Sequence, residues 1–88
     1  MKSYRFIING KVQGVYYRAN VQNNAQNSGY SGYVKNLPDG AVEAAVTCEY
    51  SQLDGFINIL KQGSRYSDVT KIKQFECNET FNGEFQRR

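Results

Sequence analysis

Apolar and polar residues alternate at the start of the chain, and the period of the pattern then changes. The alternation predicts a strand over residues 4–9. The residues on its apolar face are Tyr4, Phe6 and Ile8. Further along, an apolar residue recurs at every fourth position, which predicts a helix over residues 17–28 with one narrow apolar stripe. The stripe consists of Tyr17, Val21 and Ala25. Gly29 follows directly, where a helix commonly ends.

A hairpin is the strongest signal in the middle of the chain. Residues 30–36 and 41–49 are both expected to be strands, and Pro38 and the Asp39-Gly40 pair between them favour a tight turn. One face of the second of these strands carries Val42, Ala44, Val46 and Cys48. We therefore expect Cys48 to lie in the core.

The last part of the chain is expected to add one helix and one or two strands. Ser51 is expected to cap the helix, with Asp54 completing a capping box and Gly63 ending it. Its apolar residues are Leu53, Phe56, Ile57 and Leu60. Residues 69–77 are expected to form a strand whose alternation breaks once, which a β-bulge would repair. Residues 82–87 are expected to form a short edge strand.

The resulting order, β-α-β-β-α-β, is that of the split βαβ or ferredoxin-like plan. It predicts an α+β fold in which two helices cover one face of an antiparallel sheet of four to five strands. A chain of 88 residues has the size of one domain, so residues 1–88 are expected to fold as a single unit.

Charge and composition exclude several classes of function. The chain has 11 Lys and Arg residues against 8 Asp and Glu residues, a net charge of +3. This mild excess favours an anionic ligand but is far from the dense basic stripe of a nucleic-acid binder. Histidine is absent. Ser-His-Asp and Cys-His catalysis and the commonest metal ligand are thereby excluded.

The cysteines and the N-terminus indicate the cellular setting. Cys48 and Cys77 cannot supply the four ligands of a zinc site, and they are either two thiols or one disulfide. Thiols are favoured because residues 1–5 contain no signal-peptide core. No apolar run approaches the ~20 residues that span a bilayer. We therefore expect a cytoplasmic protein without metal, cofactor or membrane contact, and a monomer.

The segment with the clearest chemistry is residues 10–18, Gly-Lys-Val-Gln-Gly-Val-Tyr-Tyr-Arg. It joins the first strand to the first helix, so its N–H groups converge at a helix N-terminus, where anions bind. Arg18 would oppose the helix dipole there, and a bound anion would resolve the conflict because the guanidinium can hold two of its oxygens. The alternative is an ordinary turn with a solvent-facing arginine.

A second polar residue, Asn36, closes the strand before the hairpin. Its side chain can donate and accept hydrogen bonds at once, which suits it to orient a water molecule. The alternative is a turn-forming asparagine that only stabilises the hairpin.

Two segments of the chain resemble the two signature stretches of the acylphosphatase family. They are Gly10-x-Val12-Gln13-Gly14-Val15-x-x-Arg18 and Gly32-x-Val34-x-Asn36-x-x-Asp39-Gly40-x-Val42-Glu43. The residues and the separation of the segments both agree, and the resemblance covers essentially the whole chain.

The resemblance implies hydrolysis of small acyl phosphates to a carboxylate and inorganic phosphate, without metal or cofactor. It implies Arg18 and Asn36 as catalytic residues, the first binding the phosphoryl group and the second positioning the attacking water. The implied phosphate-binding residues are Gln13, Gly14, Val15, Tyr16, Tyr17 and Arg18. Three departures are mild: Tyr16 replaces a small residue, Tyr17 a phenylalanine and Tyr33 a tryptophan. Tyr16 could narrow the entrance of the site.

Two alternatives share the fold. A single-stranded RNA reader would carry aromatic residues on its central strands, but residues 41–47 contain none. A non-catalytic module that binds phosphate or an acyl phosphate would have the same anion-binding loop, and turnover would distinguish it. Of the remaining polar segments, 63–67 could contact the acyl part of a substrate but is expected to be a connecting loop, and Asp39 and Glu43 are expected to have structural roles.

Overall fold

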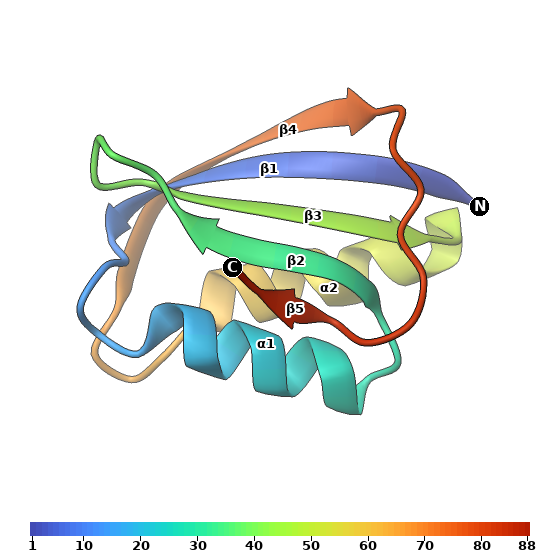
Figure 1. The fold of residues 1–88 in the computed structure, drawn as a ribbon. Helices are drawn as coiled ribbons and strands as arrows, with labels where there is room; N and C mark the ends of the chain where they lie inside the picture. The colour runs from blue at the N-terminus through green and yellow to red at the C-terminus, as the bar shows by residue number, and fades with distance from the viewer.

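Five strands form one sheet in the computed structural model, which describes residues 1–88, and their spatial order is β4-β1-β3-β2-β5 (Figure 1). The strands are β1 (Lys2–Lys11), β2 (Ser31–Asn36), β3 (Val42–Cys48), β4 (Asp68–Cys77) and β5 (Gln86–Arg87). The helices are α1 (Tyr17–Asn27) and α2 (Tyr50–Gln62). The predicted element order is confirmed, and the short edge strand expected over residues 82–87 is present as β5, which spans only Gln86–Arg87.

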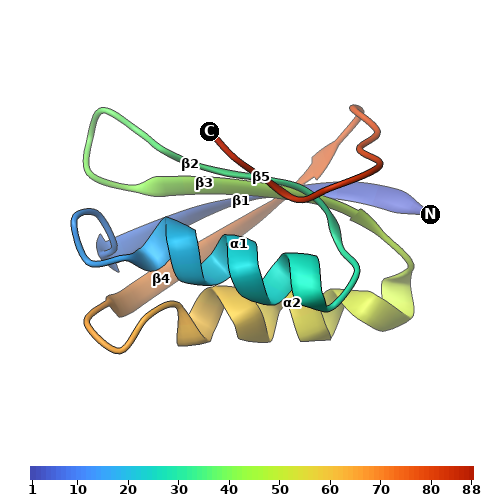
Figure 2. The ribbon, with the colours of Figure 1, turned by 60° about the horizontal axis from the view of Figure 1, so that its bottom comes forward.

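Both helices lie on the same face of the sheet, and the core fills the space between the two layers (Figure 2). Phe6 from β1 and Phe56 from α2 are fully buried, with their ring centroids 5.6 Å apart. Burial of each large apolar side chain contributes roughly 1.5–3 kcal/mol to folding. The predicted stripe of α1, residues Tyr17, Val21 and Ala25, is buried in the same cluster. The expected α+β fold of the ferredoxin-like plan is confirmed.

Strand β5 differs from the expectation of a purely antiparallel sheet. It runs parallel to β2, with Tyr33 opposite Gln86 and Val34 opposite Arg87. The other strand pairs are antiparallel. A long connection after β4 carries the chain across the end of the sheet to its other edge, which sets the direction of β5 (Figure 1).

The start of α2 also differs from the expectation. Ser51 and Asp54 do not form its cap, because the helix begins two residues earlier than a Ser51 cap implies. Glu49 is the N-cap, and its N–H donates to Gln52 Oε1 at 3.0 Å in a reciprocal capping box. A glutamate in the cap position accepts the N–H of the third helical residue as a serine would. Gly63 ends the helix as predicted.

The break in the alternation of β4 is a bulge opposite the end of β1. The pairing with β4 shifts between Asn9 and Gly10, so Thr70 has no direct partner on β1. Gly10 has a φ of 128°, and a Cβ atom built on it would lie 2.0 Å from the main-chain oxygen of Asp68. The close approach of the two strands at the bulge therefore requires glycine here.

The two cysteines are free thiols. Cys48 pairs with Lys2 on β1, whereas Cys77 pairs with the next residue, Ser3. Because successive residues of a strand point to opposite faces, the thiols lie on opposite faces of the sheet and cannot form a disulfide. Burial raises the pKa of the Cys48 thiol.

Three connections meet at one end of the sheet (Figures 1 and 2). They are the hairpin turn (residues 37–41), the β1–α1 loop (residues 12–16) and the α2–β4 loop (residues 63–67). The β1–α1 loop lies between the other two in both views. Neither helix has the length and apolar character needed to cross a bilayer.

Candidate active site

The β1–α1 loop presents main-chain N–H groups that have no partner in the chain. The N–H groups of residues 14–18 donate no hydrogen bond, and the first one that α1 makes runs from Asn20 to the Tyr16 oxygen, at 3.1 Å. Two left-handed residues, Gly14 at φ 72° and Tyr16 at φ 64°, bend the loop. Unpaired N–H groups in such a bend, at the positive end of a helix dipole, form an anion-binding geometry.

Tyr16 is the one residue other than glycine with a positive φ. A left-handed conformation costs a residue with a side chain about 1–2 kcal/mol. Tyr16 is 71% exposed, so burial of its side chain does not offset this cost. Strain of this kind persists where the surroundings or the function of a loop require the conformation.

The side chain of Gln13 fastens the loop to the hairpin turn. Its Nε2 donates to the main-chain oxygens of Leu37 at 2.7 Å and of Ala41 at 2.8 Å. The amide group is therefore turned toward the hairpin, and Gln13 fixes the position of the loop relative to the end of β2.

The opposite side of the loop is fastened to the α2–β4 loop. The Oγ of Ser64, a buried residue, donates to the main-chain oxygen of Val15. Val15 and Tyr17 have buried side chains, so each offers only its main chain to a ligand. The hydroxyl of Tyr17 donates to the Leu60 oxygen at 2.7 Å, and burial raises its pKa well above the usual range.

Arg18 extends from the first turn of α1 toward the edge of the sheet. Its Nη1 donates to the main-chain oxygen of Arg88 at 2.8 Å, and the N–H of Arg88 donates to the Val34 oxygen at 2.9 Å. Arg88, which directly follows β5, thus holds the guanidinium beside β2. The side chain is half-buried and forms no ion pair with an Asp or Glu side chain.

Asn36 is the last residue of β2 and pairs with Val42. It lies on the same face as Val34, which is fully buried under the helices, because residues two apart on a strand share a face. The Asn36 side chain is exposed and makes no hydrogen bond within the chain, so its donor and acceptor are both free.

The sequence-predicted residues therefore come together at one end of the molecule. The N–H groups of the β1–α1 loop, Arg18 and Asn36 lie on the helix-covered side of the sheet, beside the hairpin turn. The surface hollows lie elsewhere, along the start of β1 and along the start of β4. The candidate site is an open loop rather than a pocket. No three His, Cys, Asp or Glu side chains lie close enough together to hold a metal ion.

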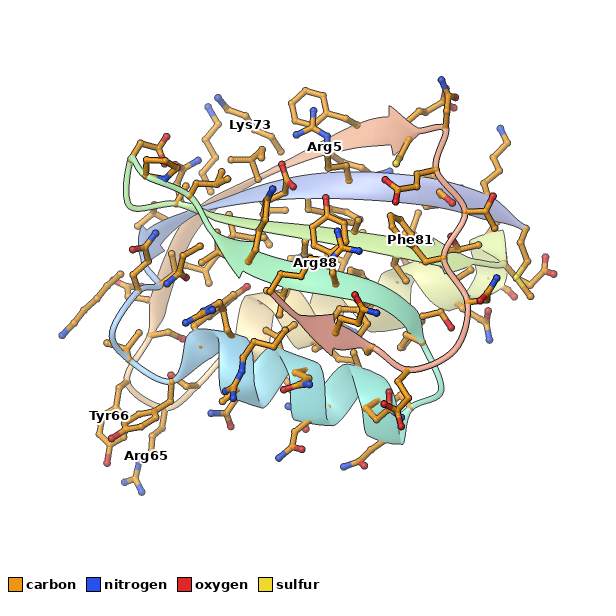
Figure 3. All side chains as sticks on the ribbon, viewed as in Figure 1. Arg5, Arg65, Tyr66, Lys73, Phe81 and Arg88 are labelled. Carbon is orange, nitrogen blue, oxygen red and sulfur yellow. The ribbon has the colours of Figure 1, made fainter.

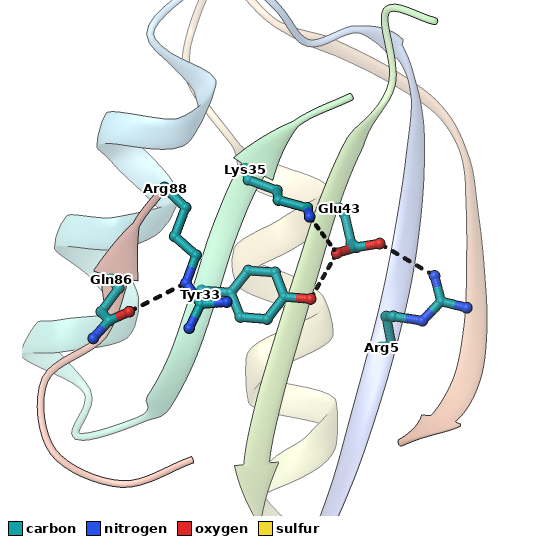
Figure 4. A network of polar contacts seen from close by, with 6 residues as sticks. All are labelled: Arg5, Tyr33, Lys35, Glu43, Gln86 and Arg88. Carbon is teal, nitrogen blue, oxygen red and sulfur yellow. Dashed lines mark hydrogen bonds and ion pairs between the residues drawn. The ribbon is translucent and has the colours of Figure 1, made fainter. Parts of the chain in front are cut away.

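Glu43 and its neighbours form a network on the face of the sheet that no helix covers (Figure 4). Glu43 accepts a hydrogen bond from the Tyr33 hydroxyl at 2.6 Å and pairs with Arg5 at 3.3 Å and Lys35 at 3.6 Å. Burial alone would raise the pKa of Glu43, but the Tyr33 hydrogen bond and the two cations outweigh it and lower the pKa. The guanidinium of Arg88 lies 4.2 Å from the centroid of the Tyr33 ring.

This network supports the candidate site from the opposite face. Tyr33 holds the side chain of Arg88, and the main chain of Arg88 holds Arg18. Asp39 has the structural role expected of it, since its Oδ1 accepts the Ala41 N–H at 3.0 Å within the turn.

Sequence reasoning missed two supports of the site. Ser64 binds a loop 49 residues away, and only the polar character of residues 63–67 hinted at such a contact. Nothing in the sequence indicated that the main-chain oxygen of Arg88 would meet Arg18.

The fold and the loop together define a class of protein. It is a small ferredoxin-like α+β domain with an anion-binding geometry where its first strand joins its first helix.

Comparison with known proteins identifies the family within this class. The family model for Acylphosphatase matches residues 4–86. The acylphosphatase of Acaryochloris marina is 44% identical over 80 residues, which are 91% of this chain and 83% of that protein. The acylphosphatase of Methanocella arvoryzae is 39% identical over 88 residues, 100% of both chains. The crystal structure of acylphosphatase from Bacillus subtilis matches with a TM-score of 0.91 at 36% identity, over 100% of this chain and 99% of that one.

The chain belongs to the acylphosphatase family. The resemblance drawn from the two signature stretches is thereby confirmed.

Proposed function

We propose that this acylphosphatase holds the phosphoryl group of a small acyl phosphate in the segment from Gln13 to Arg18 while Asn36 positions the attacking water. The observation that carries the proposal is the set of unpaired N–H groups at residues 14–18, next to the guanidinium of Arg18. The family to which the chain belongs hydrolyses acyl phosphates, and this arrangement suits that reaction.

Binding comes first in the proposed reaction. The phosphoryl oxygens carry the negative charge of the substrate, and the unpaired N–H groups and the guanidinium can neutralise it. Arg18 can use the N–H groups that do not contact Arg88. Because these donors are fixed before the substrate arrives, little reorganisation is needed during the reaction.

The water attacks phosphorus in line with the bond that breaks. Asn36 accepts a hydrogen bond from the water and points a lone pair of the water oxygen toward phosphorus. The new P–O bond forms as the bond between phosphorus and the carboxyl oxygen breaks, and its electron pair leaves with the carboxylate. The two protons of the water remain on the phosphate, so one carboxylate and one dihydrogen phosphate are formed.

This chemistry needs no histidine. A carboxylate is a weak base and leaves without a general acid, so the task of the protein is to position the water and neutralise charge. The same reasoning leads us to propose that the reaction requires no metal ion or cofactor.

We also propose that the enzyme acts as a monomer in the cytoplasm and on small molecules. One chain contributes every residue of the proposed site. The net charge of +3 and the absence of aromatic residues from Val42 to Thr47 on β3 are unlike an RNA-binding sheet.

Turnover of acetyl phosphate with and without a chelator tests the proposal. We expect release of one phosphate per acetate, at a rate that EDTA does not change, and competitive inhibition by inorganic phosphate. A strict requirement for an added divalent metal would contradict the proposed mechanism. Binding of phosphate without turnover would instead identify a non-catalytic phosphate-binding module.

A further inference from the structure

Two exposed tyrosine rings lie together next to the β1–α1 loop. Tyr16 is 71% exposed and Tyr66 is 56% exposed, and their ring centroids are 6.2 Å apart at an interplanar angle of 53°. Tyr66 and Arg65 project from the α2–β4 loop at the N-terminal end of α1 (Figure 3). A pair of exposed rings does not contribute to the core and is the kind of surface that binds a ligand.

The rings are fixed relative to the proposed phosphate position. Tyr16 belongs to the β1–α1 loop itself and follows Val15, whose oxygen accepts the Ser64 hydroxyl. Two hydrogen bonds join the ends of the α2–β4 loop. The N–H of Ser64 donates to Ser67 Oγ at 3.0 Å, and the Ser67 hydroxyl donates to the main-chain oxygen of Ser64 at 2.9 Å. Tyr66 therefore stands on a short, hydrogen-bonded loop that is bound to the phosphate-binding segment.

The geometry of the reaction sets the direction in which the acyl group leaves. In an in-line displacement the attacking water and the leaving oxygen lie on opposite sides of phosphorus. The C-terminal end of β2, whose last residue is Asn36, lies on the hairpin side of the β1–α1 loop, and the α2–β4 loop lies on the other side (Figures 1 and 2). With the water on the Asn36 side, the acyl group extends toward Tyr16 and Tyr66.

Arg65 adds a positive charge to this surface. Its guanidinium carbon lies 5.5 Å from the centroid of the Tyr66 ring, and it forms no ion pair with a carboxylate. Stacked in this way, it restrains one side of the Tyr66 ring.

We propose that Tyr16 and Tyr66 form a subsite for the acyl group and that the enzyme favours acyl phosphates with a planar aromatic acyl group. This inference rests on the proposed function, because it takes the positions of phosphate and water from it. The contact is made with a part of the substrate that does not react, so it strengthens the ground and transition states alike and acts mainly on KM.

The test compares benzoyl phosphate, which has a ring, with acetyl phosphate, which has none. In Tyr66→Ala we expect the ratio of kcat/KM for benzoyl over acetyl phosphate to fall about three- to tenfold, through KM for benzoyl phosphate. Tyr66→Phe keeps the ring and should keep the ratio. Tyr50→Ala is the matched control, since Tyr50 is 83% exposed at the start of α2, at the other end of the molecule.

Inhibition by inorganic phosphate separates this inference from the proposed function. Phosphate lacks an acyl group, so its inhibition constant should be the same in the wild type and in Tyr66→Ala. An unchanged substrate ratio in Tyr66→Ala, with phosphate still inhibiting, would overturn the subsite alone. A ratio that changes in Arg65→Ala but not in Tyr66→Ala would also overturn it, because charge rather than the rings would then select the substrate. Failure of phosphate to inhibit the wild type would instead contradict the proposed function.

Discussion

Arg18 occupies a position where a cation is unfavourable for the helix itself, because the N-terminus of α1 carries the positive end of the dipole. The structure places its Nη1 against the main-chain oxygen of Arg88, which orients the guanidinium but leaves other N–H groups for a ligand. The position of Arg18 is explained if an anion binds between the guanidinium and the unpaired N–H groups of the loop.

Loss of the guanidinium should therefore weaken both binding and catalysis. We expect Arg18→Ala to raise KM and lower kcat, with a loss of about 10- to 100-fold in kcat/KM, since a hydrogen bond to a charged group contributes about 1.5–3 kcal/mol. Arg18→Lys should recover only part of the lost kcat/KM, because an ammonium group cannot hold two oxygens in the way the planar guanidinium does. Steady-state kinetics with acetyl phosphate measures this, after thermal melting has shown both variants to be folded. Full activity in Arg18→Ala would remove Arg18 from the site.

The lowered pKa of Glu43 predicts how acid affects the stability of the protein. Its pKa is lowered in the folded state by the Tyr33 hydrogen bond and by Lys35 and Arg5, which together outweigh the effect of burial. A carboxyl with a lowered pKa contributes stability above its unfolded pKa of about 4.3, and this contribution is lost as pH falls through the folded pKa.

Glu43→Gln should consequently be less stable than the wild type at pH 7, by about 1 kcal/mol. The difference should shrink as the pH falls below the unfolded pKa of about 4.3 and through the lowered folded pKa, where the wild-type carboxyl becomes protonated. Urea unfolding of both proteins between pH 7 and pH 3 measures this difference. A difference that stays constant over this range would show that the charge of Glu43 does not contribute.

At the scale of elements, the conformation of the β1–α1 loop depends on Gly14. Its φ of 72° is in the left-handed region, and a Cβ atom there would meet nothing within 4 Å. Gly29, just beyond the C-terminal end of α1, has a φ of 82° and equally open surroundings. The two glycines thus share the same backbone requirement but lie at opposite ends of α1.

Alanine at either position should cost about 1–2 kcal/mol of stability through the backbone alone. Only Gly14→Ala should also weaken inhibition by phosphate, because only that substitution disturbs the alignment of the loop N–H groups. Thermal melting and inhibition constants for the two variants provide the comparison. If both variants bound phosphate like the wild type, the conformation at Gly14 would not be needed for anion binding.

Periodicity predicted the elements that depend on their own apolar pattern. The stripe of Tyr17, Val21 and Ala25 identified α1, and the Pro-Asp-Gly turn identified the β2–β3 hairpin. The predicted cap of α2 was wrong because the helix begins at Tyr50, where Glu49 and Gln52 form a reciprocal capping box that a preference for serine at the cap does not reveal. The position of the bulge and the direction of β5 depend on contacts between distant strands, which leave no local pattern.

The residues of the candidate site were also proposed from the sequence. The strand–helix loop and Arg18 indicated a possible anion site, and the resemblance to the acylphosphatase family implied the roles of Arg18 and Asn36. The contacts that hold these residues in place were not visible in the sequence. Gln13 binds main-chain oxygens of the hairpin turn, Ser64 binds Val15, and Arg88 binds Arg18, all across long separations in sequence. Such contacts exist only once the sheet has brought the loops together.

At the scale of the whole molecule, an anion that binds only the folded chain must stabilise it. A ligand at 100 times its Kd adds about 2.7 kcal/mol to the free energy of unfolding. For a chain of 88 residues each kcal/mol corresponds to about 4–8 °C in Tm. We therefore expect phosphate well above its inhibition constant to raise Tm by about 10 °C or more.

The same titration with Arg18→Ala is the control, since non-specific salt effects would raise Tm in both proteins. A shift of equal size in the variant would show that phosphate stabilises the chain without using the proposed site.

The division of roles between the loop and Asn36 is tested most directly by Asn36→Ala, measured for turnover and for phosphate binding on the same preparation. The Asn36 side chain is exposed and forms no hydrogen bond within the chain, so its removal should leave the fold intact. We expect kcat for acetyl phosphate to fall by about 10²-fold, because the water loses its orientation, while the Kd for phosphate from calorimetry stays unchanged. Weaker phosphate binding with an unchanged kcat would contradict the account, because Asn36 would then bind the phosphoryl group rather than position the water.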